Sequence, residues 1–388
     1  MFSMSRFNQL LQFFPRTVFH RSVQDSGADR YAKSFRSWDL LMVMLYGQLR
    51  QVESLRTLIT GFNLHQSHHY HLHTHMVRRS TCADALATRC ETPFRITCEA
   101  LMGVISRQQR NKCKQLLCIM DSTVITLKGF GYDEWAAQHR TPATQGLKIH
   151  VAIDAEQDAP TYAAITPVNV NDLTKAKQLP IVPGMTYILD KGYYDYNWWH
   201  ILNQAQARFI TRLKTNASYR VMRTYSRPNQ TILSDEVIQL ANKHPGGGRR
   251  NAYADTDLRR IAVYREDHDT PLVIVTNDFK RTARAVADLY RQRWQIELLF
   301  KGLKQKLRLK RYFGYSENAV RIQIYCALIA YLLMVLYKQN KAYNNSLSTL
   351  AIELRHGLFH RPNLNRYYYH KRKHRERFIQ NHQGVLPI

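Results

Sequence analysis

The most concentrated set of residues able to do chemistry lies in residues 288–307, DLYRQRWQIELLFKGLKQKL. At about 100° per residue, a helix over this segment gathers four polar side chains within roughly 60° of one another: Tyr290, Arg293, Glu297 and Lys304. Apolar residues form a stripe beside them, so the pattern predicts one continuous helix that docks on a core and keeps a polar edge. The same pattern also fits a solvated face that carries i,i+4 ion pairs.

Two further carboxylates end apolar runs that are typical of strands. Asp121 closes LLCIMD and Asp190 closes TYILD, where the sheet would hold each carboxylate in place and leave it accessible. Each aspartate taken alone also fits a turn or a helix cap. Two such carboxylates and a third on a helix against the same sheet would repel one another unless cations neutralised them, which predicts a divalent metal site. Oxygen ligands without a cysteine or histidine set favour Mg²⁺ or Mn²⁺.

The composition indicates what this site acts on. The 388-residue chain carries 56 Lys and Arg against 29 Asp and Glu, a formal net charge of +27. A surface of that charge attracts polyanions and releases their counterions, so nucleic acid is the predicted partner. Two carboxylate-bound metal ions about 3.5–4 Å apart would then indicate phosphodiester chemistry.

A membrane surface is the competing partner. The positive charge is spread through the chain and is not gathered on one amphipathic segment. The longest uncharged run, residues 322–337, is shorter than the about 20 residues that span a hydrocarbon core, so a buried core helix and no membrane partner are predicted. The six cysteines contain no C-x-x-C pair and no secretory signal is recognisable, which predicts reduced thiols and a cytoplasmic protein. Six histidines in residues 65–75 match no zinc pattern, so a polar connector is expected there.

The elements that position these residues fall into three regions. Residues 1–110 have helical apolar spacing, which predicts an all-helical domain. From residue 113, short apolar runs separated by turn residues and a helical segment predict an α/β sheet of mixed direction. Within it, the polar alternating runs of residues 215–270 are typical of a β-rich insertion. Residues 336–388 are a basic C-terminal tail, either solvated or in contact with phosphates.

These motifs resemble one known family. The spacing Y-x2-R-x3-E-x6-K over residues 290–304 resembles the signature of the IS4 family of bacterial insertion-sequence transposases. The segments MDSTVITL and LDKGYYD resemble the two Asp motifs of that family, in the expected order. The resemblance implies an RNase H-like catalytic core over residues 113–335, with the β-rich insertion inside it. RFNQLLQFFPR and RSTCADA resemble the helical domain that precedes this core in some members, which implies an N-terminal DNA-binding domain.

The resemblance also implies an activity. The protein would be a DDE transposase in which Asp121, Asp190 and Glu297 hold two ions of Mg²⁺ or Mn²⁺. It would bind the terminal inverted repeats of an insertion sequence, cleave the DNA at its ends and join them to target DNA. The expected route is cut-and-paste through a hairpin intermediate, within a synaptic complex that contains a homodimer. The alternative is an inactive or host-adopted RNase H-like DNA-binding protein, or a nuclease.

The DNA contacts are assigned on the same resemblance. Arg293 would grip a phosphate bidentately, Tyr290 would donate a hydrogen bond and stack on a base, and Lys304 would add a point charge. Further cations that the fold would bring towards the site are Lys148, His150, Arg212 and Lys214. Relatives stack a flipped base on an aromatic residue of the insertion, but residues 215–270 contain no Trp. The aromatic residues available there are Tyr219, Tyr225, Tyr253 and Tyr264.

Overall fold

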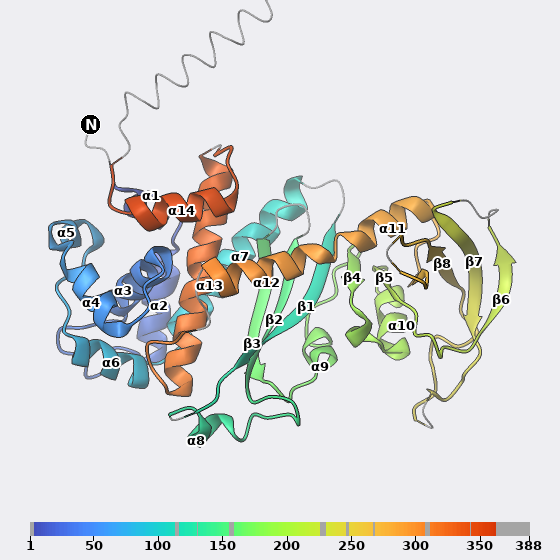
Figure 1. Ribbon diagram of the computed structural model, residues 1–388, viewed down its shortest axis with the longest axis horizontal. Helices are drawn as coiled ribbons and strands as arrows, with labels where there is room; N and C mark the ends of the chain where they lie inside the picture. The colour runs from blue at the N-terminus through green and yellow to red at the C-terminus, as the bar shows by residue number, and fades with distance from the viewer. Residues whose placement is uncertain are drawn as a thin grey trace, which may run out of the picture. The chain divides into compact units, whose positions relative to one another are not determined.

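The computed structural model (Figure 1) divides the chain into two compact units. It describes residues 4–112, 116–129, 131–154, 159–225, 230–245, 248–266, 268–306, 311–341 and 343–361, without the side chains of residues 109–112 and 303–306. The helical unit comprises the described parts of residues 1–101, 306–314 and 318–388, and the sheet unit those of residues 102–305 and 315–317.

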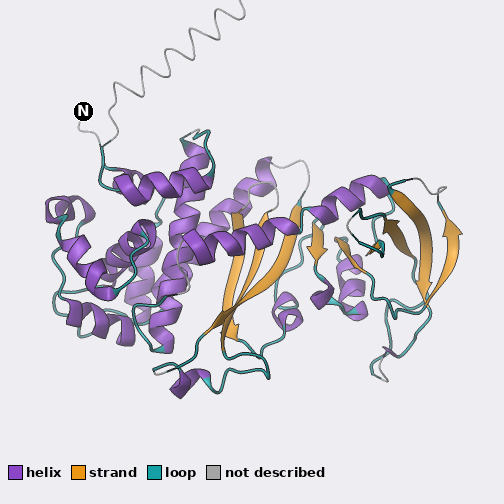
Figure 2. Ribbon diagram, viewed as in Figure 1, coloured by secondary structure: helices purple, strands orange, loops and turns teal. Residues whose placement is uncertain are grey.

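The helical unit consists of helices around two strongly buried ones, and its described residues contain no strand (Figure 2). Its helices are α1 (Arg6–Leu11), α2 (Arg16–Ser26), α3 (Ser37–Arg50), α4 (Leu55–Asn63), η1 (Gln66–His68), α5 (His69–Leu72), α6 (Arg79–Thr88), the first half of α7 (Thr92–Lys112), α13 (Glu317–Asn340) and α14 (Leu347–Gly357). Every residue of α3 except Arg50 is buried. Helix α13 is long and apolar enough to cross a membrane, but 94% of its most apolar window is buried inside the protein, as predicted for a core helix.

The domain boundaries predicted from the sequence stay predictions, although the units group the chain differently. Helix α13 lies in the helical unit, whereas the sequence placed most of it in the catalytic domain. The predicted basic tail begins within α13 and includes α14, and its residues 362–388 lie outside the described residues. The histidine-rich segment, predicted as a polar connector, forms η1 and α5. Its buried His69 stacks on Phe62, with 4.4 Å between the ring centroids.

The sheet unit is built on nine strands in the order β3-β2-β1-β4-β5-β9-β8-β7-β6. The strands are β1 (Leu117–Thr126), β2 (Gly146–Asp154), β3 (Ala159–Pro167), β4 (Thr186–Leu189), β5 (Arg208–Arg212), β6 (Tyr219–Thr224), β7 (Ile232–Leu240), β8 (Leu258–Val263) and β9 (Leu272–Thr276). The helical elements are α8 (Asp133–Ala136), α9 (Asp172–Ala176), η2 (Lys191–Tyr193), α10 (Tyr196–Gln204), α11 (Ala283–Arg291) and α12 (Trp294–Lys306).

The sheet has mixed direction, which confirms the predicted α/β class. Strands β1, β2 and β3 are antiparallel, β4 and β5 run parallel to β1, and β9 returns antiparallel to β5. Strands β6–β8, from the predicted insertion, are antiparallel and continue the same sheet through β9. The insertion is therefore an extension of the sheet and not a separate layer.

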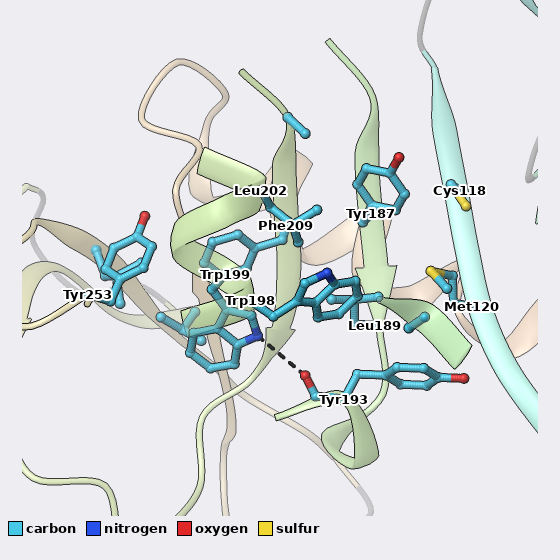
Figure 3. Packing of buried hydrophobic residues seen from close by; sticks show 14 of the residues in the cluster. Cys118, Met120, Tyr187, Leu189, Tyr193, Trp198, Trp199, Leu202, Phe209 and Tyr253 are labelled. Atoms are coloured by element: carbon cyan, nitrogen blue, oxygen red, sulfur yellow. Dashed lines mark hydrogen bonds between the residues drawn. The ribbon is translucent and has the colours of Figure 1, made fainter. Parts of the chain in front are cut away.

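A buried aromatic cluster supports the middle of this sheet (Figure 3). Trp199 of α10 is fully buried and stacks on Phe209 of β5, with ring centroids 5.1 Å apart. The Trp199 indole N–H donates a 3.4 Å hydrogen bond to the carbonyl of Tyr193, at the end of η2 (Figure 3). Because η2 begins directly after β4, this packing fixes the backbone that follows the strand.

Two local predictions were wrong. Residues 288–307 are not one continuous helix, because α11 ends at Arg291 and α12 starts at Trp294. Between them, the amide of Gln292 bonds to the carbonyl of Leu289 and that of Arg293 to the carbonyl of Tyr290. These i to i−3 bonds tighten the chain into a turn, and with no glycine or proline nearby the apolar spacing gave no sign of it.

The second error concerns Asp121, which does not end its strand. It lies in the middle of β1, which continues to Thr126 because β2 pairs with it along residues 118–126. On its other side, β1 pairs with β4 only up to Met120, opposite Leu189. Asp121 therefore lies just beyond the end of β4, where one edge of β1 has no strand partner among the described residues.

Candidate active site

The register of β1 and β4 brings two predicted carboxylates together. Met120 lies opposite Leu189 in this parallel pair, so the next residues, Asp121 and Asp190, stand side by side where β4 ends. The backbone N–H of Ser122 donates a 2.7 Å hydrogen bond to Oδ1 of Asp121. Asp190 is the residue before η2, so its backbone is fixed by the aromatic cluster below.

The third carboxylate reaches the same place through Arg293. Glu297 lies in the first turn of α12, and Nη2 of Arg293 donates a 2.6 Å hydrogen bond to its Oε1. The same guanidinium lies 4.0 Å from Asp121, between Nη1 and Oδ2, and 3.8 Å from Asp190, between Nε and Oδ1. A solvated helix face with i,i+4 ion pairs would explain only the contact of Arg293 with Glu297, because Asp121 and Asp190 are far from Arg293 in the sequence.

Burial and neighbouring negative charges disfavour the ionised form of Asp121 in this cluster. Burial raises the pKa of Asp121 to about 6, and the negative charges of Asp190 and Asp172 act in the same direction. The Ser122 N–H and the Arg293 guanidinium oppose this rise by stabilising the ionised carboxyl. For Arg293, burial alone would lower the pKa, but the hydrogen bond that it donates to Glu297 and the charge of Asp190 raise it. The carboxylates thus need a cation at their centre, and Arg293 supplies one.

The donor set fits Mg²⁺ or Mn²⁺, since it consists of carboxylate oxygens from three rigid elements that converge on one positive charge. Among the described residues, however, no group of three or more His, Cys, Asp or Glu side chains is close enough to hold a metal ion as it stands. The Arg293 guanidinium lies within 4.0 Å of all three carboxylates. The metal-binding role of Asp121, Asp190 and Glu297 stays a prediction.

A fourth carboxylate, Asp172, lies beside Asp121 and was missed from the sequence. Its Oδ1 accepts a 2.9 Å hydrogen bond from the hydroxyl of Ser122 and lies 3.0 Å from Nζ of Lys148. Nδ1 of His150 is 3.4 Å from the same oxygen. Asp172 opens the short helix α9, and an acid in the first turn of a helix is so common that it gave no separate signal.

Lys148 and His150 therefore face Asp172, not open solvent. Lys148 also donates to the carbonyl of Val170 at 2.9 Å, and its side chain is mostly buried. His150 is 3% exposed, and its Nε2 is 2.8 Å from Oγ1 of Thr166. Burial lowers the pKa of His150 to about 4, although the charge of Asp172 opposes this. A DNA contact by either residue stays a prediction.

The other predicted cations are Arg212, Lys214 and Lys304. Arg212, at the end of β5, is close enough for its charge to lower the pKa of Tyr290, which burial raises to about 12. Nζ of Lys214 lies 4.2 Å from the ring centroid of Tyr194, four residues after Asp190. Both Tyr194 and Lys214 line a cavity of about 500 Å³. The backbone of Lys304 belongs to α12, but its side chain lies outside the described residues.

The aromatic residues of the insertion differ in accessibility. Tyr253 is fully buried in the sheet core, so it cannot meet a base in this conformation. Tyr264 is 55% exposed and Tyr225 is 42% exposed. The guanidinium of Arg260 stands 5.3 Å from the ring of Tyr219.

Two family models match parts of this chain. A family model described as "Transposase DDE domain" matches residues 112–333, and a model for a domain of unknown function matches residues 3–73. The chain is 39% identical to a protein of Sinorhizobium fredii named as transposase y4zB, over 65% of this chain and 69% of that protein. It is 30% identical to a protein named as the transposase of insertion sequence element IS5377 from Geobacillus stearothermophilus, over 67% and 69%.

More distant likenesses accompany these. Transposase InsG of insertion sequence element IS4 from Escherichia coli is 26% identical over 37% of this chain and 33% of its own length. The cryo-EM structure of a piggyBac transposase synaptic complex with hairpin DNA covers 99% of this chain and 86% of that chain at 11% identity and a TM-score of 0.49.

Proposed function

This chain belongs to the DDE transposase family, as the resemblance to IS4-type insertion-sequence transposases predicted, and from that premise we propose that it cleaves the ends of an insertion sequence and joins them to target DNA. The observation that carries the proposal is the convergence of Asp121, Asp190 and Glu297 on a single guanidinium in a chain of net charge +27. We assign the RNase H-like core to β1–β5 with α11 and α12. A hairpin intermediate and a homodimer in the synaptic complex are part of the same proposal.

In this proposal, Asp121, Asp190 and Glu297 hold Mg²⁺ or Mn²⁺. The chemistry that two bound ions supply is activation of the attacking oxygen and stabilisation of the leaving oxygen of a phosphodiester. Strand β1, the end of β4 and helix α12 place the three carboxylates around the Arg293 guanidinium. Asp172 and Ser122 position Asp121 through the hydrogen bonds described above.

The neighbouring cations bind the DNA strand. Arg212 ends β5 and lies near Tyr290, and Lys214 follows two residues later, so both could offset the repulsion between a phosphodiester backbone and the carboxylates. The Tyr194 ring beside Lys214 offers a surface on which a base can stack. Together they support a path for the reacting strand along the edge of the sheet where β4 and β5 end.

Neutral substitutions of the carboxylates test this function. Asp121→Asn, Asp190→Asn and Glu297→Gln should each abolish Mg²⁺-dependent cleavage of DNA that carries the element's own ends. Each should keep end binding in a gel-shift assay, because these ligands contribute little to phosphate affinity. The matched control is Asp288→Asn, an exposed carboxylate on α11 paired with Arg284 and Arg291, which should cleave normally. Substantial cleavage by any one of the three variants would remove that residue from the active site.

Recognition of the ends is assigned to the helical unit, through α6 and its basic flank. Arg78 and Arg79 are exposed at the start of α6, whereas Arg89 at its end is held by Asp29 and the carbonyl of Phe35. Replacing Arg78 and Arg79 with Gln should weaken binding to the terminal repeats and flatten its salt dependence. Unchanged preference for the ends over random duplex would move recognition to another part of the chain.

A further inference from the structure

One arginine is the common neighbour of all three candidate metal ligands. Arg293 lies in the turn between α11 and α12, and not inside either helix. Its guanidinium hydrogen bonds with Glu297 and lies within 4.0 Å of both Asp121 and Asp190. Only 20% of its side chain is exposed, so its charge interacts with the carboxylates more strongly than a surface ion pair would.

The Arg293 guanidinium and a metal ion would compete for the same position among the three carboxylates. Mg²⁺ requires its oxygen ligands at about 2.0–2.1 Å and in near-octahedral order. Oε1 of Glu297 already accepts the 2.6 Å hydrogen bond from Nη2 of Arg293, which lies on the side of Glu297 that faces the aspartates. Three carboxylates also carry three negative charges against one positive charge, so the cluster stays short of cation even with Arg293 in place.

We propose that Arg293 is a placeholder cation, which holds the three carboxylates together without metal and leaves their centre when a divalent ion binds. This inference rests on the proposed function for the identity of the ion. Once released, the guanidinium is free to bind a phosphate of the DNA. Metal and Arg293 therefore compete for the carboxylates, whereas metal and DNA favour each other through the freed arginine.

The length of the Arg293 side chain suits such a role. Several rotatable bonds separate its guanidinium from the backbone, so changes in side-chain torsions alone can displace it. Glu297 and Asp121 have shorter side chains, on backbone held by α12 and by the pairing of β1 with β2. Arg293 is therefore the group that we expect to leave.

The first experiment measures metal affinity without DNA. Mn²⁺ is titrated into the full-length protein, and the free ion is followed by its EPR signal. The ion bound at the carboxylates is the fraction lost in Asp190→Asn. If Arg293 competes with the ion, Arg293→Met should bind Mn²⁺ about 5- to 150-fold more tightly than wild type, the range of a typical coupling between two sites. Arg293→Lys keeps the charge and should stay close to wild type.

A matched control separates this effect from a general change in charge. Arg284→Met removes an arginine on α11 that pairs with the exposed Asp288, at 3.3 Å between Nε and Oδ2. It changes the net charge by the same amount and should leave Mn²⁺ affinity unchanged. If Arg293→Met folds poorly, its melting temperature in EDTA should be low and should rise with Mn²⁺ by more than that of wild type.

The second experiment tests the link to DNA. Ca²⁺ replaces the catalytic ion at constant ionic strength, and binding of end-bearing duplex is measured by fluorescence anisotropy. Ca²⁺ should tighten binding to wild type and to Arg284→Met, but not to Arg293→Met.

Equal or weaker Mn²⁺ affinity in Arg293→Met, in a preparation whose wild type cleaves DNA, would overturn the inference and leave the proposed function standing. An absence of Mn²⁺ binding in the wild type would contradict both.

Discussion

Arg259 of β8 forms a buried ion pair, and removing its charge should strongly lower the free energy of unfolding of the sheet unit. Its Nε and Nη2 donate to the two carboxylate oxygens of Asp235 on β7, at 2.8 and 2.7 Å. The side chains are 6% and 5% exposed. Nη1 also donates to the carbonyls of Arg281 at 2.5 Å and Asp278 at 3.3 Å, in the loop that leads from β9 to α11.

Arg259→Met keeps most of the side-chain volume but leaves the Asp235 charge buried without its partner. Breaking a buried ion pair from one side costs about 3–5 kcal/mol of unfolding free energy. The two backbone carbonyls lose their donor as well, at about 0.5–1.5 kcal/mol for each net hydrogen bond. A loss of about 4 kcal/mol or more is expected. The double variant Arg259→Met with Asp235→Leu should recover most of it, because the buried charge is then removed too.

The neighbouring residue provides the control. Arg260 pairs with Glu236 at 2.8 Å, but these side chains are 16% and 19% exposed. Arg260→Met should cost less than Arg259→Met, because its ion pair is less completely buried and the Glu236 carboxylate it leaves behind can still reach water. Urea unfolding gives the midpoints, and hydrogen exchange of the β7 and β8 amides confines the signal to these strands. Equal losses for Arg259→Met and Arg260→Met would refute the argument from burial.

Three further outcomes are expected. Burial lowers the pKa of His150 from 6.5 to about 4 on folding, so between these values the unfolded chain binds more protons than the folded chain. The free energy of unfolding therefore falls as pH drops through that window. His150→Gln should reduce the difference in unfolding free energy between pH 7 and pH 4 by on the order of 3 kcal/mol, as measured by urea unfolding at both pH values. At Gly146, φ is +135° and an added Cβ would lie 2.1 Å from the Ile125 carbonyl oxygen, so Gly146→Ala should destabilise by more than about 1–3 kcal/mol, whereas Gly103→Ala in the open interior of α7 should gain up to about 1 kcal/mol. The buried Tyr253 hydroxyl has no hydrogen-bond partner among the described residues, so Tyr253→Phe should raise the unfolding midpoint slightly, and a clear loss would indicate a hidden partner.

The sequence was most informative where the signal is local. Apolar runs bounded by turns predicted the strands and their mixed direction, and the spacing over residues 290–304 with the two Asp motifs predicted the family. That Asp190 follows a strand could be inferred from its apolar run, whereas Asp121 lies within β1 and its apolar run wrongly indicated a strand end. The sequence could not predict that the two aspartates are adjacent, because this depends on β4 ending opposite Met120.

What failed depends on tertiary contacts. Nothing in the local sequence marks Arg293 as a turn residue. Its contacts with Asp121 and Asp190 also could not be predicted locally, because these residues are far from it in the sequence. Lys148 and His150 lie against Asp172, a partner that the sequence did not indicate, and their contact with DNA stays a prediction. The sequence shows that a strand residue is charged, but it does not show which residue will pair with it. For Lys148 and His150 that partner is Asp172, whose position depends on how α9 packs.

The lengths of the strand ladders have a mechanical consequence. Strand β1 pairs with β2 along residues 118–126, and β8 pairs with β9 along residues 259–263. In the middle of the sheet, β4 pairs with β5 only over residues 186–188, and β5 with β9 only over residues 210–212. A torque on β6–β8 is therefore taken up in these short central ladders, beside the strand end that carries Asp190. We therefore expect strands β1–β3 and β6–β8 each to move as a unit, with most of the twisting between them at β4 and β5. A ligand that bends the outer strands would then displace Asp190 before it displaced other parts of the sheet.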